Sequence, residues 1–499
     1  MIAGTVAGFF TPALGFPRAT MTSGTMMTTS DLTAAPVRAS GTKAIRGEHV
    51  LAFVEGRPQV LRDHWVVTEG DRIVAVTSSL PAGIDEVHDR PHQFVVPGFL
   101  NLHNHCFSEA VARTHVEDGA GRRAGKSIIY TVLLPLTKIG TEILSREERL
   151  AVARMGVLQL LKGGSTTVME PFRAGIPEMF DAALELGIRF YGAPYLFSTD
   201  MPVGRADGSV DYAASDDNPL RDLQVWQGLY DRWQGAGDGR IGLAMSPHAT
   251  DTCNPDFLRH IVGRARELGV PSTIHAAQSI GEMETIAARY DGRTPIEYLD
   301  WLGVMDRDLT IAHCIRTTDA DLDLMARRDT TILNCPRVFA RGGTVGSYAR
   351  FRSHGVRTTV ATDGYNMDLL GEVNAAALIS KITTGDATQA TAPELMNAIT
   401  LDAAEAIRRD DLGRIAVGAK ADLTVLDFSH PHLQPMYNPL RAAVWLANRA
   451  NIGMVMVDGR VLIENGHASN LDEAEVTEAG AAAIRKIWDL PEARAALDA

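Results

Sequence analysis

The chain has 499 residues, of which 45% are hydrophobic and 22% charged, and its formal net charge is −13 at pH 7. This length allows a large core or more than one domain, and the composition is ordinary for a globular protein. The acidic balance, together with the absence of any run of five or more basic residues, argues against nucleic acid or an anionic membrane surface as a partner. A small molecule is therefore the expected partner.

Four cysteines are present: Cys106, Cys253, Cys314 and Cys335. No two of them form a C-x-x-C pair, so a reduced, cytoplasmic setting is expected. Separately, we expect the protein to be a homo-oligomer. No stretch is long and apolar enough to predict a transmembrane helix. Residues 1–40 are interpreted as a disordered or upstream-extended tail. A signal peptide is less favoured, because no Lys or Arg precedes the apolar part and Pro12 interrupts it.

Predicted elements begin with short strands over 41–98, where β-branched residues alternate with Gly, Asp and Pro turn signals. From about 99 to 408, strands alternate with helices. Helical spacing is clear over 146–164, 177–187, 255–269 and 318–328. The predicted strands of this region cover 96–105, 165–171, 188–197, 240–249, 270–277, 308–314, 330–336 and 357–364.

This alternation predicts an α/β fold with a parallel sheet, and eight units suit a (β/α)8 TIM-type barrel over 99–408. A doubly wound open sheet is the main alternative, but the chain has no G-x-G-x-x-G phosphate loop. The stretches 107–145 and 199–238 lack a regular pattern and are expected to be loops that shape or cover an active site.

Strand patterns return beyond residue 409. We expect 41–98 and 409–470 to form a small β-sandwich domain that flanks the barrel. The last segment, 471–499, is predicted to form a C-terminal helix.

Polar side chains that can bind a metal follow several barrel strands, at the strand ends where parallel barrels carry their functional residues. They are His103 and His105 after the first strand, His248 after the fourth, His275 after the fifth, His313 after the sixth and Asp363 after the eighth. Any one of these histidines alone is better interpreted as a core residue. Three imidazoles and a carboxylate from separate strand ends nevertheless suit Zn²⁺ or a similar divalent ion, which would lower the pKa of a bound water towards about 7.

Seven ordered motifs then resemble the amidohydrolase superfamily, in particular its cytosine-deaminase-like and triazine-hydrolase-like branch. They are VVPGFLNLHNH (95–105), SPHATDTC (246–253), IHAAQSIGE (274–282), AHC (312–314), NCPRV (334–338), ATDG (361–364) and GRIAVGAKADLTVLD (413–427). The resemblance spans about 41–470.

The resemblance implies one divalent ion per chain, with zinc expected first and iron, cobalt or manganese as alternatives. The implied ligands are His103, His105, His275 and Asp363. His313 would bond the metal water or the substrate oxygen, and Asp363 would also act as the catalytic base. The end of the fourth strand carries no lysine of the kind that bridges two metals, which favours one ion.

Gln278 departs from the pattern of this branch, because its deaminases carry a glutamate three residues after the fifth-strand histidine. An amide cannot deliver the proton that a heteroaromatic ring nitrogen needs, and such transfer contributes about 10²–10⁴ in rate. A carbonyl substrate needs less, because a metal polarises its C=O directly. We therefore expect hydrolysis of a C–N or C–S bond next to a carbonyl in a urea, carbamate, thiocarbamate or amide, similar to phenylurea and thiocarbamate hydrolases.

The alternative is a deaminase or dechlorinase of an aminated triazine, pyrimidine or purine, with the proton supplied through His248, His313 or water. A non-catalytic barrel that binds a partner is least favoured, because the metal ligands are intact. Expected substrate contacts are His248, Gln278, Arg337 and Phe339, and a salt bridge at the barrel rim is an equal interpretation for Arg337. Phe107, Phe172 and Phe197 could also line a pocket, although core packing is expected for most of these rings.

Overall fold

The computed structural model describes residues 32–33, 41–107, 129–173, 176–200, 202–204, 210–213, 215, 217–364, 366–491 and 493–494. The tail predicted over 1–40 lies outside these residues except for Leu32–Thr33, which form strand β1 and pair with β4 (Arg72–Thr77). Within the described ranges, no helix has both the length and the apolar character needed to cross a membrane.

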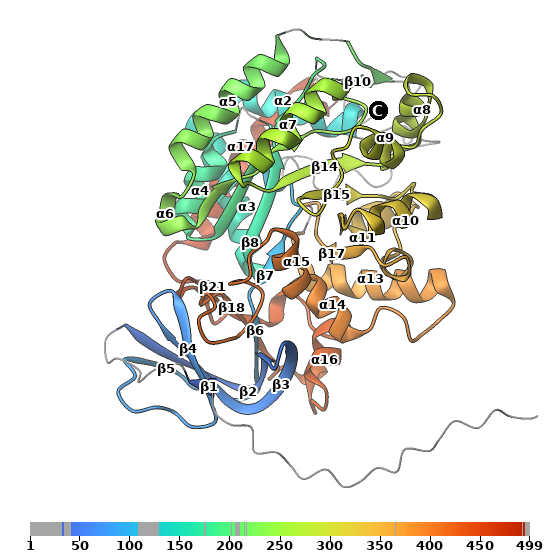
Figure 1. Cartoon of the computed structure of the whole chain (residues 1–499). Helices are drawn as coiled ribbons and strands as arrows, with labels where there is room; N and C mark the ends of the chain where they lie inside the picture. The colour runs from blue at the N-terminus through green and yellow to red at the C-terminus, as the bar shows by residue number, and fades with distance from the viewer. Residues whose placement is uncertain are drawn as a thin grey trace, which may run out of the picture. The chain divides into compact units, whose positions relative to one another are not determined.

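Parallel strands alternate with helices to form the barrel (Figure 1). The strands are β7 (Phe99–Asn101), β8 (Ser165–Phe172), β9 (Arg189–Leu196), β12 (Ile241–Leu243) followed by β13 (Ser246–Pro247), β14 (Ser272–Ala276), β15 (Leu309–His313), β16 (Thr331–Asn334) and β17 (Arg357–Val360). Parallel pairing runs through β7, β8, β9 and β12 and again through β14 to β17, and bridges from Met245 to Ser272 and from Ala249 to His275 connect the two halves. The Asp363 backbone N–H donates to the His103 carbonyl at 2.9 Å, which links the end of the last strand to the first.

The helices of the barrel region surround these strands. They are α2 (Leu134–Ile143), α3 (Arg146–Lys162), α4 (Glu178–Leu186), α5 (Asn218–Trp233), the single turn α6 (Ala236–Gly239), α7 (Pro255–Leu268), α8 (Ile280–Arg289), α9 (Pro295–Trp301), α10 (Asp319–Arg327), α11 (Pro336–Arg341), α12 (Tyr348–Ser353), α13 (Leu369–Thr384), α14 (Ala392–Ala398) and α15 (Leu401–Ala406). Helix α7 shows how local sequence sets these bounds. The Asn254 side chain accepts the Phe257 N–H at its start, and Gly269 ends it with a φ of +65°.

Two stretches that we predicted as irregular contain helices. Helix α2 lies in 107–145, after a helical turn over Ile129–Leu133, and α5 lies in 199–238. Helix α5 buries Trp226, Leu229 and Trp233 on one face. The spacing of these three residues suits a helix. Polar residues surround them along the chain, however, so the composition of the stretch resembles that of a loop. The parts 108–128 and 205–209 lie outside the described residues.

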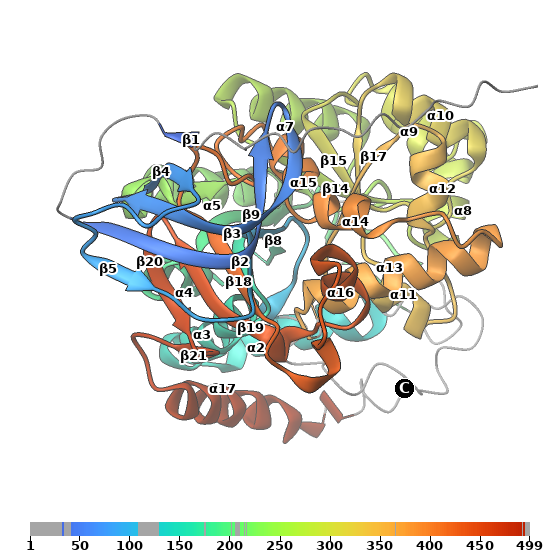
Figure 2. The ribbon, with the colours of Figure 1, turned by 90° about the horizontal axis from the view of Figure 1, so that it is seen from below.

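Both ends of the chain contribute to a second sheet, which has ten strands among the described residues. The N-terminal strands are β1, β2 (Thr42–Val54), β3 (Arg57–Glu69), β4, β5 (Glu86–His88) and β6 (Gln93–Pro97), and the C-terminal ones are β18 (Leu423–Asp427), β19 (Ile452–Val457), β20 (Arg460–Glu464) and β21 (His467–Ala468). Strand β6 joins the two groups, because it pairs in parallel with β2 and antiparallel with β18. These two partner strands are labelled in Figure 2.

The remaining C-terminal elements are mostly helical: Pro431–Leu433, α16 (Pro439–Trp445), Arg449–Asn451 and α17 (Glu473–Trp488). Helix α17 is shorter than the predicted 471–499. It begins after Asp472, which accepts the backbone N–H groups of Ala474 and Glu475, and it ends before Pro491. Its buried face packs against α3.

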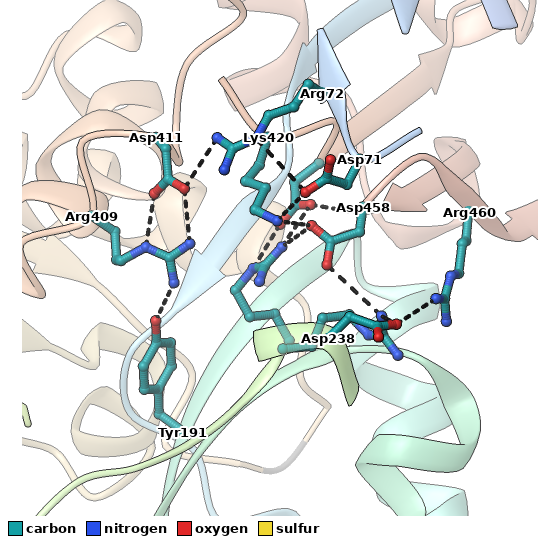
Figure 3. Close-up of polar contacts among 12 residues, drawn as sticks. Asp71, Arg72, Tyr191, Asp238, Arg409, Asp411, Lys420, Asp458 and Arg460 are labelled. Carbon is teal, nitrogen blue, oxygen red and sulfur yellow. Dashed lines mark hydrogen bonds and ion pairs between the residues drawn. The ribbon is translucent and has the colours of Figure 1, made fainter. Parts of the chain in front are cut away.

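A buried ion-pair network connects the start of β9 to the flanking sheet. Arg189 donates to Asp422 at 3.0 and 3.1 Å and to Asp458 at 2.6 Å, and all three side chains are almost fully buried. Figure 3 shows Asp458 with its second cation, Lys420, at 3.0 Å. The network joins barrel and sheet through charges that have been removed from water.

Replacing Arg189 with Ala should lower the free energy of unfolding by about 3–5 kcal/mol, because Asp422 and Asp458 would stay buried without their shared cation. Urea unfolding followed by circular dichroism measures the loss. The matched control is Arg460→Ala, whose side chain is 55% exposed and pairs with the exposed Asp238. The control should cost no more than about 1 kcal/mol, and equal losses in the two variants would contradict a special role for the buried network.

Candidate active site

The barrel brings four histidines and one aspartate together at the carboxyl ends of its strands. Ligand atoms of His103, His275 and His313 lie within 4.8 Å of one another, and so do those of His103, His105 and Asp363. The Nε2 atoms of His103 and His105 each lie 3.1 Å from Asp363 Oδ1. All five side chains are buried, so the structure assembles every residue that the sequence proposed as a ligand or as the acid–base group beside the ligands.

Backbone carbonyls orient two of these imidazoles. His105 Nδ1 lies 2.8 Å from the Pro171 carbonyl, and His275 Nδ1 lies 2.6 Å from the His248 carbonyl. A carbonyl can only accept, so each Nδ1 carries a proton, and in the neutral form of each ring Nε2 has a lone pair that can bind a metal. This arrangement is typical of metal-binding histidines.

Unpartnered nitrogen atoms test whether the site suits a metal ion. Nδ1 of His103 and Nδ1 of His313 are buried without a hydrogen-bond partner, and His103 Nε2 contacts only Asp363, at 3.1 Å. Buried polar atoms are nearly always partnered in folded proteins. Imidazole nitrogens together with a carboxylate oxygen form a donor set that zinc and other divalent transition metals prefer, so the residues fit a divalent ion.

The backbone turns sharply at two of these strand ends. His313 has a φ of +79° and Asp363 a φ of +55°, in the left-handed region that non-glycine residues rarely occupy. Such conformations persist where the surrounding structure enforces them, and they concentrate at functional sites. Here the turn at Asp363 coincides with its N–H bond to the His103 carbonyl, which places its carboxylate beside the imidazoles.

A second layer of residues supports the first strand, and the sequence analysis missed it. Asn104 donates to Glu170 at 2.7 Å and accepts from Thr362 at 2.7 Å, while Glu170 also accepts the Cys106 N–H at 2.6 Å. Burial raises the pKa of Glu170 to about 7, although Asn104 and His105 oppose the rise. The same strand-end rule could have identified Glu170, since it lies near the end of β8.

Aromatic rings flank the histidine cluster on two sides. The rings of Tyr195 and Phe197 lie 4.7 Å from that of His248, and the Phe339 ring lies 4.8 Å from that of His313. Burial lowers the pKa of both His248 and His313 to about 3, so both rings are neutral near pH 7. Phe107 and Phe172 belong instead to the hydrophobic core.

Two other predicted contact residues have distinct surroundings. Gln278 is buried, and its side-chain oxygen has no partner; its backbone N–H is held at 2.8 Å by Glu282, which also accepts the Ala277 N–H. Arg337 lies on the wall of a cavity beside Glu372, with its Nε 3.8 Å from that carboxylate. The salt bridge that we considered for Arg337 is therefore present.

Comparisons with known proteins agree with this geometry. The model of the Amidohydrolase family matches residues 94–462. A 5-methylthioadenosine/S-adenosylhomocysteine deaminase of Desulfitobacterium hafniense is 30% identical over 433 residues, or 84% of this chain and 91% of the relative. An adenosine deaminase structure from Xanthomonas campestris with bound zinc aligns with a TM-score of 0.77 and 24% identity over 90% of this chain and 99% of that one. The zinc complex of atrazine chlorohydrolase TrzN from Arthrobacter aurescens TC1 aligns with a TM-score of 0.78 and 22% identity, over 89% of this chain and 100% of that one.

The barrel and the matching family together define a hydrolase that acts on non-peptide C–N bonds. The chain belongs to the amidohydrolase family. This match confirms the amidohydrolase superfamily that the motifs resembled. The fold shared with the atrazine chlorohydrolase supports the predicted TIM-type barrel.

Proposed function

We propose that the protein is a metal-dependent deaminase of an aminated heteroaromatic compound. The observation that carries the proposal is the buried His/Asp cluster with aromatic rings near it, Phe197 beside His248 and Phe339 beside His313, since planar rings pack well against aromatic side chains. The relative from Desulfitobacterium hafniense, which matches 84% of the chain, is named as a 5-methylthioadenosine/S-adenosylhomocysteine deaminase, and this supports the choice. The relatives thus favour the reaction that the sequence placed second.

His103, His105, His275 and Asp363 would hold one divalent ion. Zinc is the first choice, because the adenosine deaminase of similar fold is described with bound zinc. When bound, such an ion activates a water molecule and polarises the atom under attack.

Asp363 is suited to be the base that takes a proton from water. Burial alone would raise the pKa of its carboxyl, but the neighbouring His313, His103 and His105 hold that pKa well below its usual value. Asp363 is therefore ionised near pH 7 and can accept a proton, which it can then return to the departing nitrogen. His313, which is neutral, is placed to hydrogen-bond the attacking or leaving group.

Gln278 is the observation that favours a second candidate function. Its amide can orient a substrate but cannot protonate a ring nitrogen, so a deaminase needs another donor, for which His248, His313 and water are available. Hydrolysis of a urea, carbamate, thiocarbamate or amide does not need that proton. This second reaction would use the same ion and the same base.

A substrate panel with a Gln278→Glu variant separates the two candidates. We expect the natural protein to release ammonia from at least one aminopurine, aminopyrimidine or aminotriazine, and Gln278→Glu to raise that kcat by roughly tenfold or more by restoring a proton donor. Ammonia release and ultraviolet absorbance measure the reaction. The matched control, Gln278→Leu, should give no gain. Turnover of carbonyl compounds alone would overturn the proposal and establish the second candidate.

The proposed setting is cytoplasmic and the proposed assembly a homo-oligomer. All four cysteines are free and buried, which supports a reduced compartment. The large apolar residues Ile382, Tyr437 and Leu446 are exposed, which supports a contact between copies. Light scattering on the purified chain measures the assembly directly.

A further inference from the structure

A cavity of about 680 Å³ is lined in part by Thr362, the residue before Asp363. Its walls come from α3, α11, α13, the segment after β17 and the turn Arg449–Asn451. Among its described lining residues are three arginines, Arg337, Arg341 and Arg449, and one carboxylate, Glu372. The volume is in the range of small-molecule sites, which is roughly 300–1,000 Å³.

Arg337 is built into this wall. Its backbone N–H donates to Glu372 at 3.1 Å and its Nε lies 3.8 Å from the same carboxylate, but its Nη1 is buried without a hydrogen-bond partner. Gly371, inside α13, faces this guanidinium: a Cβ there would lie 2.4 Å from Arg337 Nη1. Glycine is unfavourable inside a helix. At this position, however, the missing side chain leaves room for the guanidinium.

Arg449 supplies a second guanidinium. Its Nη1 donates to the Asn366 carbonyl at 3.2 Å, and no ion pair joins it to any carboxylate in the described parts of the chain. A guanidinium carries five donors in a planar fork that matches the oxygens of a carboxylate or phosphate. Arg337 Nη1 packs against Gly371, but the Arg337 side chain as a whole is 38% exposed. Its other guanidinium donors, and those of Arg449 that Asn366 does not use, are the ones that a ligand in the cavity can reach.

The cavity shares two structural elements with the histidine cluster. Thr362 lines it and directly precedes Asp363, while Phe339, on the same short helix as Arg337, contacts the His313 ring at 4.8 Å. A molecule in the cavity would contact the elements that position Asp363 and Phe339. Binding in the cavity can therefore change the positions of Asp363 and Phe339 without any contact between the ligand and the metal.

We propose that this arginine cavity binds a small molecule through a carboxylate or phosphate group. Charge-assisted hydrogen bonds from two guanidinium groups select an oxyanion over a neutral or cationic group. The proposal concerns a second binding site and goes beyond the proposed deamination, because it is independent of which C–N bond is cleaved.

Isothermal titration of inorganic phosphate into the metal-loaded full chain tests the site. We expect saturable binding that weakens roughly tenfold in Arg337→Gln or in Arg449→Gln, and more in the double variant, because each change removes a charge-assisted bond. The matched control is Arg57→Gln, an exposed arginine of β3, which should bind phosphate as the natural protein does. Absence of saturable binding, or binding unchanged in the double variant, would overturn the proposal; the latter would locate the phosphate at the metal instead.

Steady-state kinetics distinguish the two sources of the oxyanion. If the group belongs to the substrate, phosphate should raise KM without changing kcat. If it belongs to a separate effector, phosphate should change kcat. Either effect must be lost in the Arg337→Gln/Arg449→Gln double variant, and persistence of the effect in that variant would count against the cavity.

Discussion

His275→Ala should remove the bound divalent ion and, with it, essentially all turnover. His275 is buried at the end of β14, its Nδ1 proton is committed to the His248 carbonyl, and its Nε2 is free to bind a metal. Losing a ligand from a small set is more damaging than losing a supporting hydrogen bond, which alone costs about 10–100-fold in metal affinity or activity.

Elemental analysis of metal per chain, measured beside activity, checks this expectation. His432→Ala is the matched control, because His432 is exposed and lies outside the cluster; it should keep both metal and turnover. Full metal occupancy in His275→Ala would show that the proposed ligand set is wrong.

Asp363→Asn should lower kcat by about 10²–10⁴ while the protein stays folded, because the amide cannot accept the water proton. The backbone bond from residue 363 to the His103 carbonyl does not involve the side chain, so the link between β17 and β7 should survive. Thermal melting reports the fold, and kcat at fixed metal content reports the chemistry.

A matched control for Asp363→Asn is Asp386→Asn, at a half-buried carboxylate after α13 that lies outside the cluster. It should leave kcat unchanged. If Asp363→Asn kept near-natural turnover at full metal content, another group would have to serve as the base.

The barrel and the location of its site could be predicted from sequence because both follow from short-range patterns. Strand and helix periods alternate along the chain, and parallel strands put their carboxyl ends at one edge. His103, His275 and Asp363, each following a predicted strand, were therefore expected to meet, and the structure brings them together.

Contacts between distant segments could not be predicted in this way. Asn104 lies between two histidines and shows no periodic signal, yet it bridges Glu170 and Thr362. The cavity wall joins Arg337, Gly371 and Arg449 from three segments, and only the folded chain reveals their proximity. Helix α5 was missed because its local pattern is weak: its three buried aromatic and aliphatic residues are few among many polar ones.

The preference between the two reactions rested on one residue in the sequence. Gln278 argued for a carbonyl substrate, whereas similarity over most of the chain argues for deamination. A neighbouring donor can compensate for a single position, whereas the similarity to the deaminase covers 84% of the chain.

The pairing of β6 with β18 has a consequence during synthesis of the chain. Strand β6 ends at Pro97, but the strand that covers its edge begins only at Leu423. While the barrel is being translated, at roughly 5–20 residues per second, the N-terminal strands present an unpaired edge of the kind that promotes aggregation. We therefore expect a nascent chain that stops short of Leu423 to need protection by chaperones, even when its barrel is complete.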